Sequence, residues 1–267
     1  MADSAQRLRH VEHVMGTVFS FDVRGDTGPR TRTALAAATA WLHHVDEEFS
    51  PYRPGSQVSR LARGELTADG CSPEVREVLR LCADAEHRSG GWFSARYAGG
   101  LDPTGLVKGW AVERVAAMLH SAGAPDVCVN GGGDVQLHGG PWRVGVADPL
   151  RPGAVVTVVE TRQTLAVATS GPAERGCHIL DPHTGAPPAD PLASVTVVCR
   201  ALGDADAWAT AACAMGAERA HGWLEGLPGV DAFTVTPDGG TWQTAGFARL
   251  KGRYISLCGS GDRRRVY

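Results

Sequence analysis

The chain has 267 residues, of which 43% are hydrophobic and 21% charged, and this is the composition of a globular protein with a substantial core. The formal net charge is −3, and the one run of basic residues in the sequence is Arg263–Arg265. Proteins that bind nucleic acid usually carry a basic stripe, so this charge balance argues against a nucleic-acid partner.

The seven cysteines are an odd number, and they contain no Cys-x-x-Cys pair. This pattern argues against a zinc knuckle and against a fully paired set of disulfides. Residues 1–14 are polar and lack the apolar core of a signal peptide, and no stretch has the length of a membrane span. The sequence therefore predicts a reduced, cytoplasmic protein with no direct membrane insertion.

Apolar spacing predicts the secondary structure, beginning with a half-buried strand in which Phe19, Phe21 and Val23 share one face. Helices are predicted at 31–49, 72–89, 106–121 and 204–216. Further strands are predicted at 127–129, 135–137, 142–146, 154–161, 165–169, 194–199 and 232–236. The strands are joined by short glycine-containing turns and do not alternate regularly with helices, which favours antiparallel pairing. We therefore predict an α+β fold with largely antiparallel sheets flanked by helices, formed as a single domain over residues 1–267.

Two glycine-containing segments are candidates for binding phosphate. Asn130 to Asp134 encloses three glycines between two apolar strands, and it is either a hairpin turn or a loop that lets backbone N–H groups approach a ligand. Residues 102–109 precede the third helix, where Thr104 is a candidate N-cap. Together with Lys108, the exposed N–H groups there would form a cradle for an anion. The glycine spacing is not that of a P-loop.

Three further segments carry candidate functional side chains. Ser50 and Tyr52 lie in a proline-containing loop after the first helix, where an aromatic ring beside Arg53 either stacks on a planar ligand or covers the loop. Residues 176–185 place His178 three positions before Asp181, in a segment that also has the residues of a turn.

Asp206 and Thr210 are four residues apart on the predicted fourth helix, so their oxygens share one face. Hard oxygen donors of this kind suit Mg²⁺, whose shell is commonly completed by substrate phosphate. A histidine able to act as a base, near a predicted Mg²⁺ site, is typical of phosphoryl-group transfer. The chain contains no G-x-S-x-G motif, so its sequence does not support a serine hydrolase.

In combination and in order, these motifs resemble the ApbE-like FAD:protein FMN transferase family of bacterial flavin transferases. The most specific matches are residues 178–185 and 206–210. The other matching segments are Met15-Gly16-Thr17, residues 49–53, Lys108-Gly109, residues 130–134 and Ser170-Gly171.

The resemblance implies two closely packed lobes with FAD in the cleft between them and Mg²⁺ beside its pyrophosphate. It implies Asp206, Thr210 and the backbone carbonyl of Gly105 as metal ligands, and His178 as the catalytic general base. The implied FAD-binding residues are Met15, Gly16, Thr17, Ser50, Tyr52, Lys108, Asn130, Gly132, Gly133, Asp134, Ser170, Gly171 and Asp181. Asp181 either orients the imidazole or shapes the turn. Such an enzyme transfers FMN from FAD to a Thr or Ser hydroxyl of an acceptor protein and releases AMP.

The chain departs from the family pattern at two places. The stretch between Gly171 and His178 is short. Residues 102–105 differ from the more usual Asp-x-Gly-Gly or Asp-x-Gly-Ala pattern, and this departure falls on the segment that carries the carbonyl ligand. Two alternative functions use the same residues. One is a Mg²⁺-dependent FAD pyrophosphatase that gives FMN and AMP, and the other is a non-catalytic FAD-binding protein, which would need no base at position 178.

Overall fold

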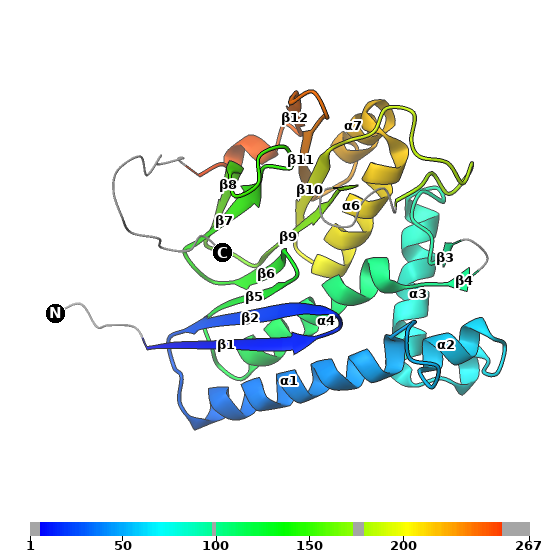
Figure 1. Ribbon diagram of the computed structural model, residues 1–267. Coiled ribbons are helices and arrows are strands. Elements are labelled where there is room, and N and C mark those ends of the chain that lie inside the picture. Colours follow the sequence, from blue (N-terminus) through cyan, green and yellow to red (C-terminus); the bar gives the residue numbers. More distant parts are fainter. Residues whose placement is uncertain (1–5, 98–99, 173–178, 253–267) are drawn as a thin grey trace.

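An antiparallel sheet of eight strands forms the centre of the molecule (Figure 1). The computed structural model describes residues 6–97, 100–172 and 179–252. Neighbouring strands in the sheet are all antiparallel. In spatial order the strands are β1 (Arg7–Val14), β2 (Thr17–Arg24), β5 (Asp126–Gly131), β6 (Asp134–His138), β9 (Leu165–Ser170), β10 (Ser194–Cys199), β11 (Asp231–Val235) and β12 (Thr241–Gln243). The predicted α+β class and its antiparallel pairing are confirmed.

Helices and two small hairpins complete the described structure. The helices are α1 (Pro29–Phe49), α2 (Gln57–Ala62), α3 (Pro73–Arg88), α4 (Thr104–Ser121), α6 (Leu202–Met215) and α7 (Ala217–Glu225), with 3₁₀ turns η1 (Ala68–Gly70) and η2 (Phe247–Arg249). The hairpins are β3 (Arg96–Tyr97) with β4 (Gly100–Leu101), and β7 (Trp142–Ala147) with β8 (Val155–Thr161). The four predicted helices are all present, and each begins within two residues of its predicted start. Among the described residues, no helix is both long and apolar enough to span a bilayer.

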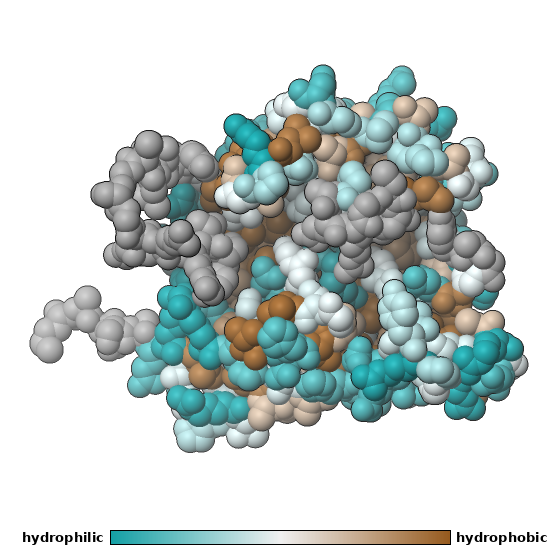
Figure 2. Space-filling model, viewed as in Figure 1, coloured by the Kyte–Doolittle hydropathy of each residue, from teal (hydrophilic) through white to brown (hydrophobic). Residues whose placement is uncertain are grey.

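The strands separate two hydrophobic layers because successive side chains point to opposite faces of a sheet. On β10, Val195 and Val197 join the larger core, to which helices α1, α3, α4, α6 and α7 contribute. Val198 points the other way and packs with the β7–β8 hairpin and Phe247. The sheet therefore has a helix side and a hairpin side, and Figure 1 shows the two sets of elements apart. A space-filling view shows the surface hollowed above the β1–β2 hairpin (Figure 2).

Helices α4 and α6 cross closely at Gly109. A Cβ atom added there would lie 2.6 Å from the carbonyl oxygen of Leu202 and 2.9 Å from Cβ of Asp206. The Gly109 N–H also donates to Oδ2 of Asp206 at 3.2 Å. Glycine at 109 thus lets the start of α4 approach the face of α6 that carries Asp206.

We expect Gly109→Ala to lower the free energy of unfolding by about 1–3 kcal/mol, because the added methyl group overpacks this crossing. The matched control is Gly203→Ala in the same interface, where the nearest atom to an added Cβ is 3.7 Å away. That methyl group fits, so the control should be neutral or slightly stabilising. Urea denaturation of the two variants measures the difference, and equal losses would contradict the account of the crossing.

A carboxylate on α4 accepts a hydrogen bond from a backbone N–H in the first turn of α6. Oε2 of Glu113 accepts a hydrogen bond from the N–H of Gly203 at 3.1 Å, while the N-cap residue Ala201 makes no side-chain cap. Burial raises the pKa of Glu113, and the Gly203 N–H partly opposes that effect. The folded protein therefore holds a proton on Glu113 more firmly than the unfolded chain does.

The raised pKa of Glu113 predicts a stability contribution that is lost as pH rises. It is complete below the ordinary glutamate pKa of about 4.3, and it disappears as pH increases through the raised pKa of the folded state. Relative to Glu113→Gln, which cannot ionise, the wild-type protein should lose free energy of unfolding across that window. Urea denaturation of both proteins from roughly pH 4 to 8 tests this, and a constant difference would show that the carboxyl group does not titrate as proposed.

Candidate functional site

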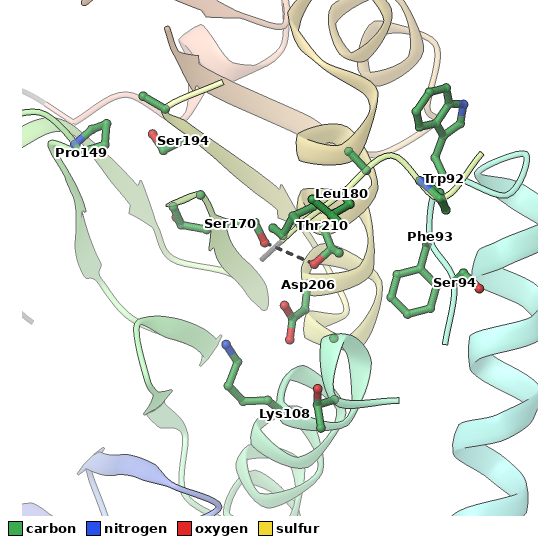
Figure 3. Close-up of a pocket in the computed structure, with 18 of the residues that line it drawn as sticks. Trp92, Phe93, Ser94, Lys108, Pro149, Ser170, Leu180, Ser194, Asp206 and Thr210 are labelled. Carbon is green, nitrogen blue, oxygen red and sulfur yellow. Dashed lines mark hydrogen bonds between the residues drawn. The ribbon is translucent and has the colours of Figure 1, made fainter. Parts of the chain in front are cut away.

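A cleft of about 500 Å³ lies where β9 ends and β10 begins, and residues of α4, α6 and the β7–β8 turn line it (Figure 3). Of the residues predicted from the sequence, Gly105, Lys108, Ser170, Gly171, Asp206 and Thr210 line this cleft. They come from segments far apart in the chain, so the fold brings together groups that the sequence could only place one by one.

The three predicted metal ligands lie along one wall of the cleft. The residue Asp206 is 5% exposed, and it is followed one turn later on α6 by Thr210, whose Oγ1 lies 3.3 Å from Oγ of Ser170. A Cβ atom added to Gly105 would lie 3.9 Å from Thr210 Oγ1, so the start of α4 reaches the same point. A carboxylate, a hydroxyl and a backbone carbonyl are hard oxygen donors that fit Mg²⁺. In the described ranges, no three His, Cys, Asp or Glu side chains gather as a metal-binding group.

Lys108 is anchored at the cleft by a buried carboxylate. Its Nζ lies 2.5 Å from Oδ2 of Asp134, whose side chain is 2% exposed. The other oxygen of Asp134 accepts from the N–H of Thr169 at 3.0 Å. Asp134 thus fixes both the lysine and the end of β9, and the lysine brings positive charge to the cleft wall.

The beginning of α4 faces the cleft, but its cap differs from the prediction. Thr104 is the first residue of the helix, not its N-cap, and the N-cap Pro103 makes no side-chain cap bond. Instead Oδ1 of Asp102 accepts from the N–H of Thr104 at 3.0 Å. The prediction of Thr104 as N-cap is wrong because Thr104 is itself the first helical residue, and the Asp102 carboxylate supplies the acceptor. Thr104 and Gly105 still line the cleft, so the positive end of the helix dipole points toward it.

The glycine-rich segment between β5 and β6 is a hairpin turn. Gly132 and Gly133 have φ values of +61° and +99°, and the Gly133 N–H donates to Oδ1 of Asn130 at 3.0 Å. A Cβ atom on Gly132 would lie 2.7 Å from Oγ1 of Thr17, so the β1–β2 turn is its direct neighbour. Gly132 and Gly133 have the positive φ values that this turn requires, and among the described residues that line the cleft none belongs to 130–133. The role of Asn130, Gly132 and Gly133 in binding FAD stays a prediction.

Other predicted ligands lie on turns that do not contribute to the described cleft lining. Met15 and Gly16 form the turn between β1 and β2, with φ values of +55° and +67°. Ser50 ends α1, and Tyr52 is 92% exposed in the loop that follows. Their roles as FAD ligands stay predictions.

The segment that gave the most specific sequence match borders the cleft. His178 lies outside the described residues, whereas Ile179, Leu180 and Pro182 line the cleft. Oδ1 of Asp181 accepts from the His183 N–H at 2.8 Å, and its carbonyl accepts from Gly185 N at 2.8 Å. In this structure Asp181 shapes the turn.

Sequence reasoning missed several lining residues. Trp92 and Phe93 form an aromatic wall, with Trp92 edge-on to His183 at 4.6 Å between ring centroids. Unpredicted lining residues at the other end of the cleft include Ala147, Asp148, Pro149, Pro152 and Ser194. The double glycine before Trp92 was a usable signal, since such a break often begins a functional loop, but nothing local marked Ser194.

Taken together, the oxygen donors, the anchored lysine and the helix N-terminus define a cleft suited to a ligand that carries phosphate. A model of the ApbE family matches residues 15–99 and 95–234. The chain belongs to the ApbE family, and the resemblance predicted from the motifs is confirmed.

Similar proteins agree with this assignment. The FAD:protein FMN transferase of Rhodobacter capsulatus is 37% identical over 220 residues, which cover 77% of this chain and 38% of the relative. The protein of the same name from Treponema pallidum (strain Nichols) is 30% identical over 159 residues, 52% of this chain and 44% of the relative. This chain thus spans roughly two fifths of the length of these curated relatives.

Solved structures confirm the fold. The flavinyl transferase ApbE of Pseudomonas stutzeri, in its apo form, matches with a TM-score of 0.81 and 25% identity, covering 96% of this chain and all of that one (100%). The flavin transferase ApbE of Vibrio cholerae matches with a TM-score of 0.81 and 22% identity, covering 92% and 99% of the two chains.

Proposed function

We propose that the chain is a Mg²⁺-dependent FAD:protein FMN transferase that moves FMN from FAD to a Thr or Ser hydroxyl of an acceptor protein. The observation that carries this proposal is the convergence of Asp206, Thr210, Gly105 and Lys108 on one cleft in a chain of the ApbE family. Four of the seven matching segments contribute to the cleft lining: residues 108–109 on α4, 170–171 at the end of β9, 178–185 and 206–210 on α6.

The residues of the cleft would act mainly by binding and positioning the pyrophosphate. Lys108 and the N-terminus of α4 would hold its negative oxygens, while Asp206, Thr210 and the Gly105 carbonyl would hold Mg²⁺. When bound, Mg²⁺ neutralises charge on the pyrophosphate and on the departing AMP. Asp134 keeps Lys108 directed at this site through the 2.5 Å ion pair.

The chemical step replaces a phosphoanhydride bond with a phosphoester bond. The acceptor hydroxyl oxygen forms a bond to the phosphorus on the FMN side, and the bond from that phosphorus to the bridging oxygen breaks. AMP leaves with the bridging oxygen, and the hydroxyl proton passes to His178 as general base. This role of His178 rests on the family motif, and Asp181 would act by shaping the turn that follows it.

The test separates transfer from hydrolysis by following products. The purified chain is incubated with FAD and Mg²⁺, with and without a panel of acceptor proteins that carry an accessible Thr in a small-residue segment, and AMP and free FMN are quantified by chromatography. Transfer predicts AMP without equivalent free FMN, and only with an acceptor, because a docked hydroxyl has a large effective concentration relative to water. Equal release of AMP and FMN at the same rate with every acceptor would identify a pyrophosphatase instead. Bound FAD with no turnover would identify a binding protein.

A further inference from the structure

The cleft has a second polar group at its hairpin-side end, on strand β10. Because side chains alternate along a strand, Ser194 shares a face with Thr196 and Val198, and Val198 belongs to the hairpin-side core. Ser194 lines the cleft beside the β7–β8 turn. Figure 3 draws Ser194 and Pro149 on one side of Asp206 and Thr210, with Trp92 and Phe93 on the other.

The Ser194 hydroxyl is buried without a hydrogen-bond partner in the described part of the chain. The residue is 4% exposed. The next hydroxyl on the same strand face differs, since Oγ1 of Thr196 lies 2.9 Å from Oγ1 of Thr169. Buried hydroxyl groups are normally hydrogen-bonded, and an unpaired one is disfavoured. A hydroxyl of this kind at a cleft wall is placed to pair with a molecule bound in the cleft.

The surroundings of Ser194 in the cleft are largely apolar. Ala147, Pro149 and Pro152 give this end of the cleft short apolar walls. The nearby carboxylate of Asp148 is already engaged, because it accepts from Leu150 N at 3.0 Å and Arg151 Nε at 2.8 Å. These bonds hold the pKa of Asp148 below its usual range. Asp148 therefore stabilises the turn, while the Ser194 hydroxyl stays available to a ligand.

We propose that the Ser194 hydroxyl binds the polar edge of one of the two ring systems of FAD, seated against Ala147, Pro149 and Pro152. This inference rests on the proposed function. FAD carries a ring at each end of its pyrophosphate, and the oxygen donors Asp206 and Thr210 lie between the Ser194 end and the aromatic end of the cleft. Both rings present nitrogen or oxygen atoms at their edges, and a serine hydroxyl can donate or accept and can turn between staggered rotamers to reach them.

The experiment compares Ser194→Ala with Thr234→Val by calorimetric titration with FAD in the presence of Mg²⁺ and by thermal unfolding without ligand. Thr234 is a matched buried hydroxyl outside the cleft lining, 3.0 Å from Nε2 of His221. We expect Ser194→Ala to weaken FAD binding about 3- to 10-fold, the value of one neutral hydrogen bond, without lowering the melting temperature. Thr234→Val should lower the melting temperature and leave the FAD affinity unchanged.

Separate titrations with AMP and FMN then identify the ring. A loss confined to AMP assigns Ser194 to the adenine edge, and a loss confined to FMN assigns it to the flavin edge. The inference is overturned if wild type and Ser194→Ala bind FAD equally, or if Ser194→Ala is destabilised like Thr234→Val. A wild-type protein that binds no FAD would instead overturn the proposed function, and this inference with it.

Discussion

Asp206→Asn is expected to lower the rate of FMN transfer by about 100- to 1000-fold, because it removes the one carboxylate from the proposed metal ligands. The amide oxygen of asparagine can still accept from the Gly109 N–H, a bond that Asp206 makes at 3.2 Å. The fold should therefore survive, and FAD binding should weaken less than turnover. Single-turnover rates over a range of Mg²⁺ concentrations measure the loss, and higher Mg²⁺ should restore part of it.

The matched control is Asp204→Asn, two residues earlier on α6. The Asp204 side chain is 44% exposed and lies 3.6 Å from Arg88, and surface pairs of this kind contribute little to stability. Transfer and its Mg²⁺ dependence should be unchanged in this variant. If Asp206→Asn kept the wild-type rate at limiting Mg²⁺, or if both variants lost the same activity, the proposed metal site would be wrong.

His178→Ala is expected to slow transfer by about two to four orders of magnitude, the usual contribution of a general base. FAD binding should change little, since the proposed role of the imidazole is to take the hydroxyl proton. Single-turnover rates with saturating FAD and acceptor measure this effect. The pH dependence of the transfer rate gives an independent readout. The acidic limb, which is the fall in rate at low pH that we assign to protonation of His178, should disappear in the variant.

His183→Ala is the comparison for this second prediction. His183 is exposed in the same motif, and its ring packs edge-to-face with Trp92 at 4.6 Å between the ring centroids. Its removal should therefore change transfer only a few-fold. A wild-type rate in His178→Ala, with the acidic limb retained, would leave His178 without a catalytic role.

The parts of the site that the sequence predicted are those fixed by local spacing. Asp206 and Thr210 share a helix face because they are four residues apart, and both line the cleft. The position of Lys108 at the cleft could be predicted because the residue lies in the first turns of α4. The strand face with Phe19, Phe21 and Val23 is buried as its alternation predicted.

The parts that the sequence did not reveal depend on contacts between distant segments. The pairing of Lys108 with Asp134 joins α4 to β6. The hydroxyl of Ser194 can be assigned to the cleft only when the position of the β7–β8 turn beside it is known. The strand β1 was missed because it lies at the edge of the sheet, where exposed residues such as Arg7 and Arg9 interrupt the apolar pattern. Gly109 looked like part of a binding motif, and its packing against Leu202 could be seen only in three dimensions.

The most direct test of the proposed activity is the intact mass of an acceptor protein after incubation with the chain, FAD and Mg²⁺. The account predicts a mass gain equal to one FMN joined through a phosphoester, with release of AMP. The gain should disappear when the acceptor Thr or Ser is replaced by Ala, when Mg²⁺ is chelated, or when Asp206→Asn replaces the wild-type chain. Acceptors that keep their original mass while FAD is cleaved to FMN and AMP would contradict it.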